Sequence, residues 1–334
     1  ERVHSRPRAL GARTLVLPVD VGTLPRSAVF VRLPRAEPLD VFVHRTTGSE
    51  GLVAYDRSGA MKWRRALRGP HVVTACGRTV YVVDGRRLEA LEHDTGAVRW
   101  SQTIEGEVVR LGAIGCDLLL ARRGDAATST FADVVHVLGA RDGRARVEVP
   151  CTGCLPRSVS RDTFVWTSPV GVHVLDADAD DVTLYALRLP DDDAIKGRAG
   201  NTLIVFREGE LSGIDLDGTV RFRRRGRVRV LLVGETYVLV ATSTALEVLD
   251  TTTGALRHRI ETEGALRVGL EDARAFAIDD TRALVRMSEP LALEAVVDVA
   301  SGHVDALRAL PFAIETTLVR DGYVLHAGNE LLYA

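Results

Sequence analysis

The segment Cys151-Thr152-Gly153-Cys154 has the spacing that most directly suggests chemistry in this chain. Four interpretations are open: a local disulfide, which needs an oxidising compartment, half of a zinc site, a redox-active pair, or two inert thiols. A zinc site needs a second pair of ligands, and the other cysteines, Cys76 and Cys116, are isolated from each other. We favour the disulfide, which indicates a protein that works outside the cytoplasm.

Alternating carboxylates, Asp176, Asp178 and Asp180, resemble part of a calcium-binding loop. However, the segment lacks the glycine and the glutamate that an EF-hand loop requires. It also coincides with a turn that recurs along the chain and carries an aspartate at this place. We therefore expect a solvated acidic turn, with a calcium site as the alternative.

Six arginines form the densest run of positive charge, namely Arg221, Arg223, Arg224, Arg225, Arg227 and Arg229. Such a run can bind an acidic partner or phosphate groups. Asp191–Asp193 lies in a connection of the same kind, so we expect the two segments to neutralise each other. The alternative is that Arg223, Arg224, Arg225 and Arg227 bind a partner.

His136 and His173 occupy matching positions in consecutive repeats, which suggests a pair of metal ligands. The same position in other repeats is occupied by Val53, Glu89, Ser212, Glu247 and Ala295. A variable and mostly polar set predicts an exposed or half-exposed position rather than a metal site.

Catalytic motifs are missing from the sequence. No Gly-x-Ser-x-Gly, His-Glu-x-x-His or P-loop pattern occurs. We therefore expect no catalytic residues, no cofactor and no enzyme activity.

A turn that recurs seven times along the chain marks the boundaries of the strands that carry these residues. It is clearest in Ala54–Trp63 and Ala90–Trp100, and fainter copies lie around Gly143, Asp181, Gly218, Gly254 and Gly302. The copies are separated by 36–48 residues. This repeat length is typical of the four-stranded blades of a β-propeller.

Each repeat contains four short strands. Thr79–Val83 and Leu88–Leu91 flank a tight turn, the next strand carries Trp100, and Glu107–Leu111 begins the following repeat. No stretch has the 3.6-residue periodicity of an amphipathic helix. The pattern predicts an all-β protein of four-stranded antiparallel sheets.

The position four residues beyond each turn is mostly bulky. It is occupied in order by Trp63, Trp100, Val147, Tyr185, Phe222, His258 and Ala306. A large flat side chain on the outermost strand can pack between adjacent blades and contribute about 2–3 kcal/mol. We expect this blade packing from Trp63, Trp100, Tyr185 and Phe222.

These repeats resemble the PQQ-like β-propeller family, whose units read roughly Ala-Leu-Asp-x-x-Thr-Gly-x-x-x-Trp. The match is closest in the first two units and in Val248–Gly254, and it weakens elsewhere because the later units lack the tryptophan. The resemblance implies a fold and not an activity. The quinoprotein dehydrogenases of the family are longer and carry cofactor-binding insertions that this chain lacks. In length and layout it is similar to the non-enzymatic members, such as the scaffold lipoprotein of outer-membrane barrel assembly.

Residues 322–334 read as the start of an eighth unit that lacks its last strand. Because an open sheet edge promotes aggregation, we expect the apolar residues 13–20 to supply that strand. The prediction is an eight-bladed β-propeller over residues 13–334, preceded by an N-terminal arm of residues 1–12. A seven-bladed ring with spare strands is the alternative.

Charge and composition limit the classes of partner that the protein can be expected to bind. The chain has 334 residues, 46% of them hydrophobic, and a formal net charge of −2. This balance gives no general attraction to nucleic acid or to an anionic membrane. No apolar run is long enough for a transmembrane helix. Only Lys62 and Lys196 are lysines, which is typical of a GC-rich bacterial genome.

We therefore expect a non-catalytic protein-binding or scaffold propeller, bacterial and periplasmic or extracellular, that acts as a monomer or in a complex. Its protein or peptide partner would bind the rim that carries Cys151, Cys154 and Arg225. The alternative is a sensor or adaptor propeller of a larger signalling protein, located in the cytoplasm. A mature lipoprotein begins with cysteine, and this sequence begins with Glu1, which favours the alternative if nothing precedes it. A PQQ-dependent dehydrogenase is disfavoured.

Overall fold

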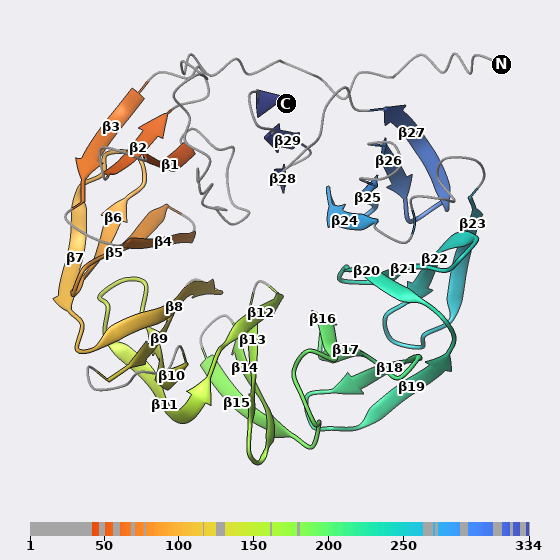
Figure 1. Cartoon of the computed structure of the whole chain (residues 1–334), viewed down its shortest axis with the longest axis horizontal. Helices are drawn as coiled ribbons and strands as arrows, with labels where there is room; N and C mark the ends of the chain where they lie inside the picture. Colours follow the sequence, from red (N-terminus) through yellow and green to blue (C-terminus); the bar gives the residue numbers. More distant parts are fainter. Residues whose placement is uncertain are drawn as a thin grey trace. The chain divides into compact units, whose positions relative to one another are not determined.

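The computed structural model shows a protein built from β-strands (Figure 1). The structure describes residues 42–46, 51–55, 61–67, 71–76, 78–115, 117–124, 131–160, 162–178, 181–262, 270, 273–287, 293–309, 316–320, 323–327 and 332–333. They divide into two compact units at the boundary between Asp192 and Asp193. Within the described residues there is no helix with the length and hydropathy of a membrane span.

The first unit, which ends at Asp192, contains four antiparallel sheets made from strands that are consecutive in sequence. Sheet 1 comprises β1 (Phe42–Thr46), β2 (Gly51–Tyr55) and β3 (Met61–Ala66). Sheet 2 comprises β4 (His71–Cys76), β5 (Thr79–Asp84), β6 (Arg87–Glu92) and β7 (Val98–Thr103). Sheet 3 comprises β8 (Glu107–Ile114), β9 (Asp117–Arg123), β10 (Ala132–Leu138) and β11 (Ala145–Cys154). Sheet 4 comprises β12 (Arg157–Ser160), β13 (Thr163–Ser168), β14 (Gly171–Asp178) and β15 (Asp181–Leu187).

The second unit, from Asp193 onwards, repeats this arrangement. Sheet 5 comprises β16 (Ile195–Ala199), β17 (Thr202–Arg207), β18 (Glu210–Asp215) and β19 (Val220–Arg225). Sheet 6 comprises β20 (Arg229–Val233), β21 (Tyr237–Ala241), β22 (Ala245–Asp250) and β23 (Leu256–Glu261). Sheet 7 comprises β24 (Arg274–Ala277), β25 (Arg282–Met287), β26 (Leu293–Asp298) and β27 (His303–Ala309). Sheet 8 comprises β28 (Thr316–Arg320), β29 (Tyr323–Ala327) and β30 (Leu332–Tyr333).

The recurring turn joins the third and fourth strands of a sheet. In sheet 6 the amide of Gly254 donates to the carbonyl of Asp250 at 2.9 Å, and Gly254 has a φ of +67°. The Asp250 carboxylate accepts the amides of Thr252 and Thr253 at 2.9 and 2.8 Å. These bonds and the nearby Arg257 are why the aspartate and the glycine recur at this spacing, because glycine adopts a positive φ without strain.

Neighbouring sheets within each unit pack face to face through their middle strands. In the first unit, one apolar cluster joins Leu52 of sheet 1 to Val80 of sheet 2, and another joins Tyr81 of sheet 2 to Leu118 of sheet 3. The outer strands β7, β19 and β23 instead alternate between half-buried and exposed residues. The middle strands are apolar on both faces because both faces are covered.

The predicted all-β architecture of four-stranded antiparallel sheets is confirmed. Six of the eight sheets in the described part of the chain have four strands, and sheets 1 and 8 have three. The predicted arm of residues 1–12 and the strand of residues 13–20 lie outside the described residues. The closing of the last sheet therefore stays a prediction.

Candidate protein-binding surfaces

The two tryptophans of the repeat pack between neighbouring sheets. The indole of Trp63 on β3 lies over the turn glycine of sheet 2, where a Cβ added to Gly96 would come within 2.8 Å of the ring. Trp100 on β7 lies in the same way over Gly143 of sheet 3, at 2.9 Å. Each indole N–H donates to a main-chain carbonyl of that turn, at 2.8 Å for Trp63 and 3.0 Å for Trp100. The aromatic residue and the glycine thus form one contact.

The second unit contains the same contact with other side chains. Phe222 on β19 lies against Gly254 of sheet 6, and His258 on β23 lies against Gly302 of sheet 7. Tyr185 on β15 is half-buried. The sequence identified the bulky side of this contact. The glycine of the contact was recognised only as a turn residue. The sequence of one repeat does not show which residue of the next repeat its aromatic side chain will contact.

The prediction that the histidine column is exposed is wrong. Six of its seven members are at most 9% exposed, namely Val53, Glu89, His136, Ser212, Glu247 and Ala295. The seventh, His173, is half-buried. The column lies on β2 of sheet 1 and on the third strand of each four-stranded sheet, where polar side chains are buried because the neighbouring strands supply partners for them.

Two glutamates of this column form ion pairs with the preceding sheet, which the sequence analysis missed. Glu247 on β22 is 3% exposed and accepts Arg224 of β19 at 2.7 Å and Arg259 of its own sheet at 2.8 Å. Glu89 on β6 likewise accepts Arg65 of β3. Both cross-sheet arginines lie two residues beyond a packing aromatic. An arginine at that place with a glutamate 23–24 residues later is a signal that could have predicted the pairs.

The arginine run divides between two roles. Arg224 points toward sheet 6 and pairs with the buried Glu247, so it is a structural residue. Arg223 and Arg225 lie on the exposed face of β19 and share Glu210, at 3.8 and 3.3 Å. Arg227 follows the strand and is exposed. Of the four candidate partner-binding residues, three therefore lie together on the surface.

Asp192 of the aspartate segment has local partners on sheet 4. Arg157 at the start of β12 binds the carboxylate of Asp192 at 3.0 Å and also its carbonyl. Thr167 donates to the same carboxylate at 2.5 Å. Asp192, Arg223 and Arg225 thus each have a partner within their own unit, and the expected neutralisation between the two segments stays a prediction.

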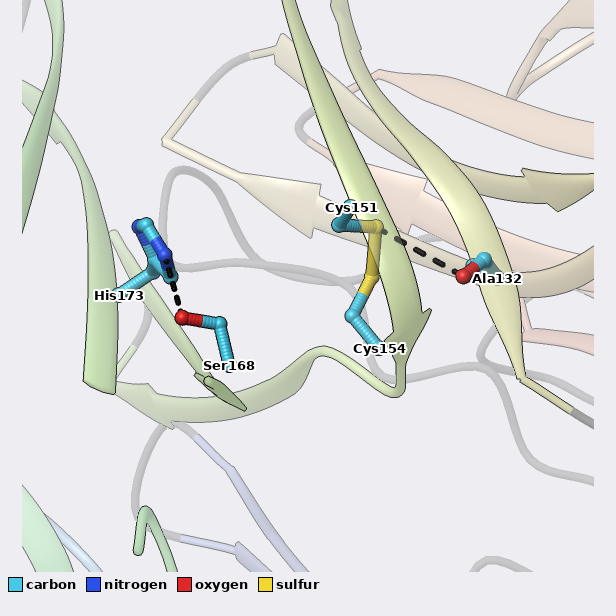
Figure 2. The surroundings of a disulfide bond; sticks show 5 residues. All are labelled: Ala132, Cys151, Cys154, Ser168 and His173. Carbon is cyan, nitrogen blue, oxygen red and sulfur yellow. Dashed lines mark hydrogen bonds between the residues drawn. A yellow bond between two sulfur atoms is a disulfide. The ribbon is translucent and has the colours of Figure 1, made fainter. Parts of the chain in front are cut away.

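A disulfide joins Cys151 and Cys154 at the end of β11, with an S–S distance of 2.08 Å (Figure 2). It closes a bulge in this outer strand. Pro150 lies opposite Val134 of β10, whereas Cys154 lies opposite Ala132, so the bulged strand has extra residues between these pairs. The structure thus contains the disulfide that the sequence analysis favoured.

Three exposed apolar side chains lie next to the disulfide in the chain, next to the strand that pairs with it, or in a turn of the following sheet. Phe131 directly precedes β10, Leu155 directly follows Cys154, and Val170 lies in the turn between β13 and β14; they are 45%, 50% and 74% exposed. The register of β12 on β13 carries Leu155 toward that turn. We call Phe131, Leu155 and Val170 the disulfide patch. Clustered apolar side chains of this kind mark interaction sites.

A serine and a histidine lie beside this region, on sheet 4. His173 Nε2 is 2.9 Å from the Ser168 hydroxyl oxygen (Figure 2). That hydroxyl also donates to the Gly171 carbonyl at 3.1 Å and accepts the Val170 amide at 3.2 Å, so it caps the turn. Thr242 caps the corresponding turn of sheet 6 in the same way. The Ser168 hydroxyl therefore caps this turn, as Thr242 does in sheet 6.

The surroundings of His173 favour its neutral form. Its ring stacks on Trp166 with the ring centroids 5.4 Å apart, and burial lowers the pKa of His173. His136 has a partner of its own, because Arg122 Nε donates to His136 Nε2 at 2.8 Å. The two histidines therefore contact different groups, and no group of three or more metal-binding side chains occurs in the described residues.

Of the three aspartates considered for calcium, only Asp176 has a described side chain, so the expectation of an acidic turn stays a prediction. Asp176 is buried and accepts the hydroxyl of Thr163 at 3.2 Å. Asp215 accepts Thr202 in the same way in sheet 5, at 3.0 Å, so the pair belongs to the repeat. Asp178 ends β14, and Asp180 lies outside the described residues.

Four pairs of neighbouring sheets, two pairs in each unit, are joined by an aromatic residue on a turn glycine. Consecutive four-stranded antiparallel sheets joined in this way are typical of the β-propeller fold. A protein-family model described as outer membrane protein assembly factor BamB matches residues 48–145. The resemblance to the PQQ-like propeller family is confirmed.

Solved structures with the same fold include three proteins of different kinds. BamB from Moraxella catarrhalis is 15% identical, with a TM-score of 0.53 over 92% of this chain and 95% of that one. Apo AztD from Citrobacter koseri is 12% identical, with a TM-score of 0.55 over 86% and 87%. Dihydro-heme d1 dehydrogenase NirN in complex with DHE is 14% identical, with a TM-score of 0.53 over 84% and 66%. No curated protein matches the sequence.

Proposed function

We propose that this protein is a non-catalytic bacterial propeller that binds a partner protein outside the cytoplasm. The observation that carries the proposal is the disulfide patch, since Phe131 and Leu155 are exposed beside a covalently fixed bulge and Val170 is exposed in a turn of the next sheet. Fixing a loop before binding reduces the entropy that binding costs. The match of residues 48–145 to an outer membrane assembly factor supports the same function.

The compartment follows from the disulfide. Disulfides persist in oxidising compartments and are rare in the bacterial cytoplasm. In cells that produce the protein, we expect Cys151 and Cys154 to resist alkylation until a reductant is added. Alkylation of both residues without a reductant would contradict an extracytoplasmic location.

Site-specific photo-crosslinking in the producing cell tests partner binding. A photo-reactive residue at Leu155 or Val170 should give one adduct of defined mass. The control is Val98, which is 44% exposed. It lies at the start of β7, the fourth strand of sheet 2, whereas the disulfide lies at the end of β11, the fourth strand of sheet 3. Equal labelling from all three positions, or none, would contradict the proposal.

Turnover is tested separately, because NirN is a dehydrogenase with the same fold. The purified protein is mixed with PQQ and Ca²⁺ and assayed for dye-linked oxidation of alcohols and sugars. We expect no activity above that of the buffer, since the chain lacks the long cofactor-binding insertions of the quinoprotein dehydrogenases. Clear turnover would make the protein an enzyme.

A further inference from the structure

The exposed face of β19 carries more positive charge than the equivalent faces of β7 and β23. Arg221, Arg223 and Arg225 alternate along this face. The strands β7 and β23 have the same burial pattern, so this face is exposed at the equivalent place in other sheets. The comparison with these strands shows which arginines have a structural role.

The first arginine of the face has such a role. Arg221 binds the turn residue Asp215 at 2.6 Å. Arg99 on β7 binds the turn residue Glu92 at 3.2 Å, and Arg257 on β23 also binds its turn aspartate. In these three sheets, the first arginine of the strand forms an ion pair with an acidic residue of the turn. The positive charge of this arginine is therefore neutralised within its own sheet.

The second arginine lacks the partner that its counterpart has. Arg223 corresponds to Arg259 of β23, which binds the buried Glu247 at 2.8 Å and Glu261 at 2.5 Å. The residue opposite Arg259 is Glu247, whereas the residue opposite Arg223 is Ser212. The repeat therefore supplies no buried acid for Arg223.

The third arginine replaces an acid. Arg225 stands where β23 has Glu261, and its side chain is 90% exposed. Arg223, 64% exposed, and Arg225 share the single carboxylate of Glu210. Arg227 adds a further exposed positive charge directly after the strand. We call Arg223, Arg225 and Arg227 the arginine edge.

We propose that the arginine edge binds an extended acidic segment of a partner protein, laid alongside β19. The inference rests on the proposed protein-binding function and names the chemistry of one partner segment. β19 is the last strand of sheet 5 and pairs with β18 alone among the described strands. Its outer edge can therefore hydrogen-bond an added strand.

Spacing favours a peptide as the occupant. Alternate residues of a strand are about 6.6 Å apart, so alternate carboxylates of an added strand match Arg223 and Arg225. A second copy of β19 is disfavoured, since like charges opposite each other repel. The formal net charge of −2 of the whole chain does not favour nucleic acid.

The test measures the binding of a short synthetic peptide in which glutamate alternates with threonine and valine, by fluorescence anisotropy with the full chain. We expect binding that weakens as salt is added. Replacing Arg223, Arg225 and Arg227 with serine together should weaken it about tenfold or more. Arg224 stays unchanged, because its loss would leave Glu247 without a cross-sheet partner.

The matched control replaces three exposed arginines elsewhere, Arg141, Arg144 and Arg188, with serine. It changes the net charge equally and should leave the affinity within about twofold, since the proposal assigns the binding to the arginine edge and not to the net charge of the chain. Equal loss in both triple variants, absent binding, or equal binding of a peptide with methylated main-chain nitrogens would overturn the inference. So would tighter binding of a single-stranded oligonucleotide. Crosslinking at Leu155 with no peptide binding would overturn only the arginine edge, because it tests the disulfide patch separately.

Discussion

Buried glutamates connect neighbouring sheets at the residue scale. Glu247 is 3% exposed on its side chain, yet it accepts two arginines that are themselves 30% and 44% exposed. A buried carboxylate is costly unless it is paired, and arginine suits this role because its planar group can donate while its stem packs on apolar neighbours. Glu89 forms the same kind of ion pair with Arg65 of the preceding sheet. The repeat therefore joins neighbouring sheets by a buried ion pair as well as by the aromatic contact.

Removing this lock on one side should destabilise the protein. We expect Glu247→Ala to lower the free energy of unfolding by about 2–3 kcal/mol, because Arg224 and Arg259 would lose their shared acceptor. Urea unfolding measures the change. Glu235→Ala, an exposed glutamate of the same sheet, is the control and should cost less than about 0.5 kcal/mol. Similar losses in both variants would show that the buried pair contributes little.

A histidine makes the stability depend on pH. Burial, and then the positive charge of Arg122, lowers the pKa of His136, although Glu148 at 3.5 Å acts in the opposite direction. The unfolded chain therefore takes up a proton near pH 6.5, whereas the folded chain does so only at lower pH. Stability should fall as the pH drops through this window.

The measurement is urea unfolding at pH 7.5 and pH 5.5. His136→Gln should lose less stability than the unchanged protein, since the glutamine oxygen can accept Arg122 and does not titrate. Part of the loss should remain, because burial also lowers the pKa of His173. Asp250, with a pKa lowered to about 2 chiefly by Arg257, contributes only at more acidic pH. An identical loss with and without His136 would refute the assignment.

Turn and outer strand act together at the element scale. Trp63→Ala should cost about 3–5 kcal/mol, as for other buried aromatics. Gly96→Ala should also destabilise, because Gly96 has a φ of +69° and a Cβ there would lie 2.8 Å from the indole of Trp63. In the double variant the clash is absent, so the two losses should not add. Additive losses would mean that the contact is not shared.

Elements were easier to predict than contacts between them. The expected strands Thr79–Val83 and Leu88–Leu91 agree with β5 and β6 to within a residue at each end, because alternation and turn residues act locally. The burial of Glu89 was missed, since its partner Arg65 comes from another sheet. The exposure of Phe131 likewise depends on three-dimensional packing and has no signal in the sequence.

At the scale of the whole molecule, we expect an N-terminal strand to complete the last sheet. We predict that residues 13–20 pair with the strand near Leu332–Tyr333 as the last strand of sheet 8. Deleting residues 1–21 should then expose an edge and cause aggregation or a large fall in Tm. Size-exclusion chromatography and thermal unfolding measure both. A truncated protein that stays monomeric with an unchanged Tm would refute the pairing.

The aromatic contact also has a consequence for synthesis on the ribosome. Trp63 donates to a carbonyl 30 residues later, and Trp100 to one 40 residues later. Sheets 1 and 2 are therefore each packed against the stretch of chain that is translated next. At about 5–20 residues per second, an unfinished sheet waits only seconds for its partner. The order of translation and the order of packing coincide, which shortens the time in which a nascent apolar face is open to misassembly.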